Sequence, residues 1–158
     1  MFRKLLVPTD GSELARETGA AAINLAKEIN ASVVVVSILQ PLAAIPFYEG
    51  VGVVGAGADN LMQAHARKQA DEAVEAICSI GRSAGVKCEP RVLEADSISH
   101  GIVDAAKQSA CDLIVIGTHG RRGLSNILMG SVTRSVLPHA HVPVLVWRNQ
   151  EKDGFGAA

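Results

Sequence analysis

The chain has 158 residues and a formal net charge of −1, and 48% of its residues are hydrophobic while only 3% are aromatic. This length suits one ordinary domain, and the near-neutral charge argues against a nucleic-acid binder, which needs a basic face. No apolar run is long enough to cross a membrane, and the first one is too short for a signal peptide. The three cysteines include no C-x-x-C pair, which argues against a disulfide framework. We therefore expect a cytoplasmic protein.

Short apolar runs without helical periodicity predict the strands of a sheet that is covered on both faces. A fifth segment, from Val86 to Val92, alternates in polarity and is interrupted by Pro90. Proline cannot donate to a central ladder, so this segment is expected to be an edge strand. The four continuous runs cover residues 5–7, 33–36, 113–116 and 144–146.

Helical patterns lie between the predicted strands. Apolar residues three or four positions apart predict helices over about 13–29, 70–84 and 98–106, and a short one from Val132 to near Pro138. The spacing of Asp10 and Glu13 is that of a capping box for the first helix. Strict alternation of strands and helices predicts a single-domain, doubly wound, Rossmann-like parallel sheet with helices on both faces.

Two segments fall outside these elements. Residues 40–58 are rich in glycine and proline and too long for an ordinary connection, which predicts a flexible loop. Residues 149–158 are polar and small, which predicts a disordered tail.

The loop after the first strand, Pro8-Thr9-Asp10-Gly11-Ser12, combines a carboxylate and two hydroxyls at a predicted helix start. Ligands of open parallel sheets bind beyond the carboxyl ends of the strands, where the strand order reverses. One interpretation is that the polar side chains of this loop are turn and capping groups. A second is that Asp10 holds a ribose hydroxyl or a metal ion beside phosphates, and the two roles are compatible.

The loop after residues 113–116 is rich in glycine, with Gly117 directly after the strand and Gly130-Ser131 opening a helix. Glycine lets backbone N–H groups approach an anion closely, and the first N–H groups of a helix lack internal partners. Ser131 and Thr133 add hydroxyl donors. The pattern predicts a phosphate-binding loop, in which His119 either contacts the ligand or is a structural loop residue.

Several other motifs are discounted. The glycines of 50–55 match a dinucleotide fingerprint, but they lie in a long loop and not in a tight strand-to-helix turn. Residues 120–123 match the GXXG loop of an RNA-binding KH domain, but that loop joins two helices and this one follows a strand. The sequence contains no Walker A G-K-[ST] motif.

The spacing Gly117-x2-Gly120-x9-Gly130-Ser131 resembles the nucleotide-binding signature of the universal stress protein family, G-x2-G-x9-G-[S/T]. Residues 5–12 and 141–147 resemble the first and last strands of that family, so the likeness covers about residues 2–148. It implies one domain over 1–148 with five strands in the order 3-2-1-4-5. One departure is that residues 95–101 replace the usual Gly-x-Pro start of the third helix.

The resemblance also implies a function. Members of the family that keep the glycine motif bind ATP, so we expect a regulatory protein that binds ATP or AMP, with Mg²⁺ or Mn²⁺ bridging the phosphates. A slow ATPase or phosphoryl-transfer enzyme on the same scaffold is the alternative. The resemblance further implies a homodimer, or a tetramer, through antiparallel pairing of Val142 to Val146. The implied nucleotide contacts are Pro8, Thr9, Asp10, Ile38 and Ile116 at the ribose and adenine, and Gly117, His119, Gly120, Gly130, Ser131, Val132 and Thr133 around the ribose and phosphates.

Overall fold

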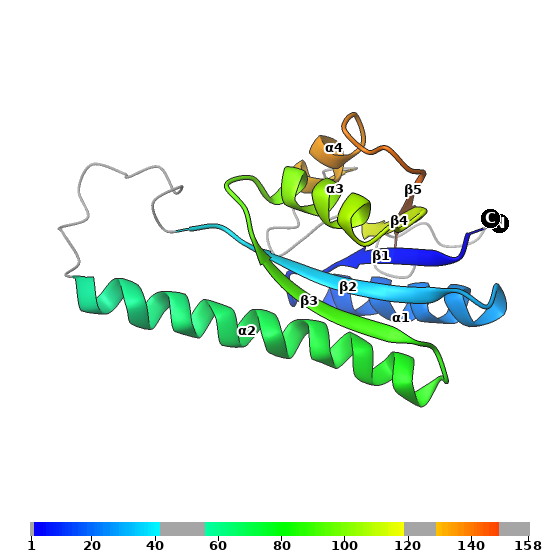
Figure 1. Cartoon of the computed structure of the whole chain (residues 1–158), viewed down its shortest axis with the longest axis horizontal. Coiled ribbons are helices and arrows are strands. Elements are labelled where there is room, and N and C mark those ends of the chain that lie inside the picture. The colour runs from blue at the N-terminus through cyan, green and yellow to red at the C-terminus, as the bar shows by residue number, and fades with distance from the viewer. Residues whose placement is uncertain (1, 42–55, 119–128, 149–158) are drawn as a thin grey trace, which may run out of the picture.

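The structure is a computed structural model that describes residues 2–41, 56–118 and 129–148 (Figure 1). Strands and helices alternate along these residues, as the sequence predicts. The elements are β1 (Lys4–Pro8), α1 (Glu13–Glu28), β2 (Ser32–Leu39), α2 (Ala56–Ser83), β3 (Cys88–Glu94), α3 (Ile98–Gln108), β4 (Leu113–Gly117), α4 (Ser131–Val136) and β5 (Val144–Trp147).

The strands form one parallel sheet in the order β3-β2-β1-β4-β5, which confirms the predicted fold class and strand order. Leu5 of β1 lies opposite Val33 of β2 on one side and Leu113 of β4 on the other. The proline-containing strand β3 is an edge strand, also as predicted, because Pro90 has no N–H to donate. The order reverses at β1, so β1 and β4 are neighbours in the sheet.

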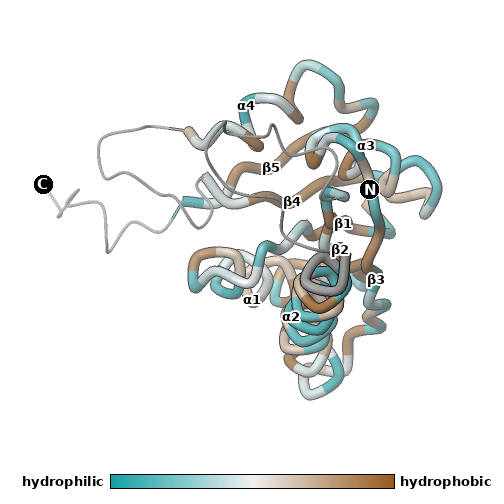
Figure 2. The backbone as a smooth tube through the Cα atoms, turned by 90° about the vertical axis from the view of Figure 1, so that its left-hand side faces the viewer, coloured by the Kyte–Doolittle hydropathy of each residue, from teal (hydrophilic) through white to brown (hydrophobic). Residues whose placement is uncertain are grey.

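Helices cover both faces of the sheet (Figure 2). Successive residues of the central strands pack in different core clusters, because they point to opposite faces. Leu5 and Val7 pack in one core cluster with residues of α1 and α2. Leu6 packs in a second cluster with residues of α3 and α4, among them Ile102. Burial on both faces explains why the strands read as continuous apolar runs instead of alternating ones.

The first helix is capped by Ser12 and not by the predicted pair of Asp10 and Glu13. The Ser12 hydroxyl accepts a hydrogen bond of 3.2 Å from the Ala15 backbone N–H. The Asp10 carboxylate instead accepts a 2.9 Å bond from the N–H of Ser12 and so closes the turn before the helix. Because the helix begins at Glu13, the cap must be the residue directly before it.

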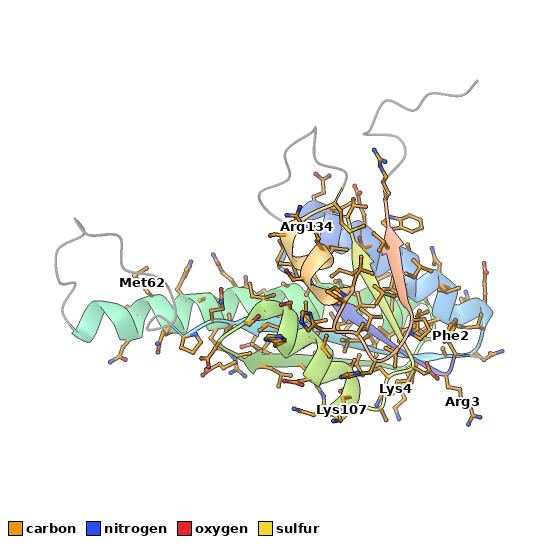
Figure 3. The ribbon with its side chains drawn as sticks, turned by 90° about the horizontal axis from the view of Figure 1, so that it is seen from above. Phe2, Arg3, Lys4, Met62, Lys107 and Arg134 are labelled. Atoms are coloured by element: carbon orange, nitrogen blue, oxygen red, sulfur yellow. The ribbon has the colours of Figure 1, made fainter. Side chains whose placement is uncertain are left out.

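Helix α2 begins at Ala56, well before the apolar stripe that predicted a helix from residue 70. Its first turns extend beyond the sheet, where Figure 3 labels Met62. Leu61 and Met62 are 74% and 58% exposed, so this part of the helix carries no buried stripe from which it could be predicted. The helix includes the end of the predicted loop 40–58, while residues 42–55 and the predicted tail 149–158 lie outside the described residues.

The start of α3 departs from the family pattern, yet it is packed closely. Its N-cap, Ser97, makes no side-chain capping bond. A Cβ atom added at Gly101 would lie 2.9 Å from both Ala95 Cβ and Ile38 Cγ2, so the glycine lets this helix approach β2.

Within the described ranges, no helix combines the length and the apolar character needed to cross a membrane.

Candidate functional site

The two loops that the sequence singles out follow neighbouring strands. Residues 9–12 follow β1, and residues 118–130 follow β4, which pairs with β1 in parallel register. Both loops therefore leave the sheet on the same side, at the edge formed by the carboxyl ends of the parallel strands. This edge, at the reversal of strand order, is where ligands bind in open parallel sheets.

The first loop is held by its own hydrogen bonds. The N–H of Thr9 donates to the carbonyl oxygen of Val36 at 2.8 Å, which continues the pairing of β1 with β2. The Thr9 hydroxyl accepts from the Gly11 N–H at 3.2 Å, and Gly11 has a φ of 78°, a conformation that favours glycine. Thr9 is buried and Asp10 is half-buried. The hydrogen bond from the Ser12 N–H fixes the Asp10 carboxylate just beyond the carboxyl end of β1.

The two described ends of the second loop are tied together by Thr118. Its N–H donates to the carbonyl oxygen of Trp147 at 2.9 Å, and its own carbonyl oxygen accepts a bond from the Gly130 N–H. Sequence reasoning did not select Thr118, and the only signal for it is its place directly after Gly117. It is a buried residue that joins β4, β5 and the start of α4.

A second bond joins α4 to β4. The Thr133 hydroxyl donates to the carbonyl oxygen of Gly117 at 2.7 Å. The predicted role of Thr133 as a hydroxyl donor to an anion therefore does not match this structure, in which the side chain is buried and its proton is directed to the protein. The bond instead positions α4 beside the end of β4.

The start of α4 supplies backbone donors. Gly130 is the N-cap, and the first bond within the helix runs from the Arg134 N–H to the Gly130 carbonyl oxygen at 3.0 Å. The N–H groups of the first turn, on Ser131, Val132 and Thr133, precede any acceptor within the helix. Ser131 is exposed, so its hydroxyl lies on the surface at this helix start.

The predicted apolar residues are brought to one face of the sheet. Ile116, near the end of β4, is buried in the cluster beneath α3 and α4, and Ile38, near the end of β2, packs against the same cluster. Pro8 ends β1, the strand between them.

Two predicted contacts cannot be placed, since His119 and Gly120 lie outside the described residues. Over the parts of the chain that the structure describes, no group of three or more His, Cys, Asp or Glu side chains is arranged to hold a metal ion. Among the predicted contacts in those parts, Asp10 is the only carboxylate.

Comparisons with known proteins show which family and fold this chain resembles. Residues 1–148 match the family model described as the universal stress protein family. Universal stress protein MJ0531 of Methanocaldococcus jannaschii is 35% identical over 153 residues, which cover 97% of this chain and 86% of that protein.

Solved structures show the same fold. The structure of MJ0577, also from Methanocaldococcus jannaschii, is 25% identical with a TM-score of 0.77, covering 95% of this chain and 99% of that one. The universal stress protein of Archaeoglobus fulgidus, solved in complex with dAMP, is 25% identical with a TM-score of 0.65. That likeness covers 94% of this chain and 98% of the other.

Proposed function

Because the chain belongs to the universal stress protein family, we propose that it binds an adenine nucleotide, ATP or AMP, beyond the carboxyl ends of β1 and β4. One observation carries this proposal. Hydrogen bonds from Thr133 to Gly117 and from Gly130 to Thr118 hold the two ends of the glycine motif together at the end of β4. The Archaeoglobus fulgidus relative, which was solved with dAMP, supports adenine as the base.

The proposed roles follow from the chemistry of each group. The first-turn N–H groups of α4 and the Ser131 hydroxyl would donate to the phosphates. Asp10 and Thr9 would bind the ribose, because a carboxylate accepts hydrogen bonds from sugar hydroxyls. Ile38 and Ile116 would border the adenine. Pro8, Gly117, His119, Gly120, Gly130, Val132 and Thr133 complete the proposed contacts, with Thr133 acting through its backbone N–H.

The described residues fit a metal ion only in part. Mg²⁺ and Mn²⁺ prefer oxygen ligands, and Mg²⁺ is often bound through one or two carboxylates together with substrate phosphates. Asp10 is the one carboxylate among the proposed contacts and would hold either the ribose or the metal ion, so the phosphates and water would have to supply the other oxygens. A bound cation would neutralise phosphate charge at this site.

We also propose that the protein acts as a cytoplasmic regulator through a homodimer that pairs the two copies of β5. This strand is an edge of the described sheet, and its alternate residues Leu145 and Trp147 are 36% and 37% exposed. An open apolar edge strand invites pairing with another chain. Antiparallel pairing of residues 142–146 would cover it.

The test of nucleotide binding is a titration of the purified full chain with labelled ATP, with AMP and GTP as competitors. We expect saturation in the micromolar range, displacement by AMP and weak displacement by GTP. Failure to saturate at millimolar ATP would overturn the proposal. Inorganic phosphate measured in the same samples reports whether bound ATP is hydrolysed, which separates a regulator from a slow ATPase.

A further inference from the structure

Two cysteine side chains meet where α2 turns back into β3. Cys78 lies near the carboxyl end of α2, and Cys88 is the first residue of β3. The helix and the strand are joined by a tight turn, in which the Val86 N–H donates to the carbonyl oxygen of Gly81 at 2.9 Å and Gly85 has a φ of 76°. This turn brings the start of β3 back over the last turns of the helix.

Gly81 shows how close that approach is. A Cβ atom added at Gly81 would lie 3.0 Å from Cys88 Cβ and 3.3 Å from Cys88 Sγ. Cys78 is three positions earlier in α2, hence on the same side of the helix as Gly81. Cys78 belongs to the core cluster beneath α1 and α2, and the partly buried Cys88 packs against the same cluster.

We propose that Cys78 and Cys88 form a reversible intramolecular disulfide when the protein encounters a hydroperoxide. The pair is distinct from the proposed nucleotide site, because Cys88 begins its strand and the nucleotide would lie beyond the opposite, carboxyl ends of the strands. A disulfide here would join α2 covalently to the edge strand β3.

The two thiols differ in a way that assigns their roles. The Cys78 thiol donates its hydrogen bond to the sulfur of Cys88, which lowers the pKa of Cys88, and the positive charge of Arg82 lowers it as well. The same hydrogen bond and burial raise the pKa of Cys78. Cys88 is only half-buried while Cys78 is fully buried, so Cys88 is the thiol that a peroxide can reach.

The reaction has two balanced steps. The Cys88 thiolate attacks one oxygen of the hydroperoxide, an S–O bond forms, the O–O bond breaks, and hydroxide or alkoxide leaves. The sulfur of Cys78 then attacks that of Cys88, so that the S–S bond forms, the S–O bond breaks, and water leaves with the Cys78 proton. Two electrons pass from the two thiols to the peroxide, and an added dithiol reverses the change.

Cys111 is the internal control. It is the third cysteine of the chain and packs in the other core cluster, across the sheet from the pair. Burial raises its pKa to about 11, so it stays a thiol at neutral pH. We therefore expect peroxide to leave Cys111 free.

The experiment treats the folded, full-length protein with a small excess of hydrogen peroxide, removes the peroxide with catalase, unfolds the protein and labels free thiols with N-ethylmaleimide. We expect the number of labelled cysteines to fall from three to one. Trypsin should then release residues 69–82 linked to residues 88–91, while the peptide 108–121 carries the label. Pretreatment with dithiothreitol before labelling should restore all three thiols.

The variants C78A and C88A should each abolish the linked peptide and keep Cys111 labelled, and C111A should form the link as the natural chain does. Alanine is preferred to serine at Cys78 because a buried hydroxyl would need a partner. The peptide map of the unaltered chain decides the matter even if a variant folds poorly. Three labelled thiols, a link that includes Cys111, or a link only between two chains would overturn the proposal.

Discussion

The hydroxyl of Thr133 donates a hydrogen bond of 2.7 Å to the carbonyl oxygen of Gly117, and this bond joins the first turn of α4 to the last residue of β4. Thr133 is only 3% exposed, so its hydroxyl has little access to water. The position of the α4 backbone donors relative to the sheet thus depends on a side chain that need not touch the ligand itself.

Replacing Thr133 with valine tests this dependence, because valine keeps the shape of threonine and removes the donor. Loss of one such hydrogen bond should lower the free energy of unfolding by about 1 kcal/mol. We also expect weaker binding of ATP, since the N–H groups of α4 would be less well positioned. Urea unfolding and the ATP titration measure the two effects. T133S keeps the hydroxyl and serves as the control, and a T133V protein that matches it in both measurements would contradict this prediction.

Substitution of Gly130 by valine should separate binding from folding. Gly130 has a φ of −66° and a ψ of 159°, an extended conformation that any residue adopts. Valine is a poorer N-cap than glycine, so the stability should fall by about 1 kcal/mol. Its side chain would fill the space proposed for a phosphate, and ATP affinity should fall by more than tenfold.

Calorimetry of nucleotide binding, together with circular dichroism to verify the fold, measures both consequences of G130V. The control is S131A, which removes one exposed hydroxyl and leaves every backbone N–H in place. Its effect on affinity should be much smaller. An unchanged affinity in folded G130V would show that the glycine motif does not surround the phosphates.

Most of the sheet could be predicted because its central strands are buried on both faces. The continuous apolar runs around Leu6, Val34 and Ile114 are typical of strands that are covered on both faces. The first turns of α2 could not be predicted, since exposed residues such as Leu61 do not form a periodic pattern. Hydrophobic periodicity arises where one face of a helix is buried, so it gives no signal where a helix extends beyond the core.

The candidate site was predictable in its residue types and less so in its contacts. Glycine spacing indicates where backbone must lie close to a ligand, so Gly117 and Gly130 could be found from the sequence. The bonds made by Thr118 and Thr133 depend on how β4, β5 and α4 meet in space. The same holds for Ser12, because a shift of the helix start by one residue would make a different polar side chain the N-cap.

Cys111 predicts a specific pH dependence of stability. Burial raises the pKa of this thiol to about 11, whereas an unfolded cysteine has a pKa of about 8.5. Between these values the unfolded chain has lost the proton and the folded chain keeps it, so the stability contributed by Cys111 falls as the pH rises. Below about pH 8 this contribution is constant.

The measurement compares the unaltered chain with C111A in urea unfolding from pH 7 to pH 11. Alanine leaves a cavity whose cost does not depend on pH, so only the change of the difference with pH is informative. We expect the unaltered chain to lose stability relative to C111A above about pH 8.5. A difference that stays constant over the whole range would show that this thiol is not shielded from water in the folded protein.

The proposed dimer depends on the edge strand β5. Leu145 and Trp147 lie on the exposed side of the edge strand β5, which would pair with its copy in a second chain. Changing Leu145 to glutamate places two like charges close together across that interface, and such contacts destabilise a sheet. We expect L145E to sediment as a monomer in analytical ultracentrifugation, while L61E, which alters an exposed leucine on α2, sediments like the unaltered chain. A monomeric unaltered chain would rule out the dimer, and a dimeric L145E protein would contradict an interface at β5, because two glutamates facing each other there should separate the chains.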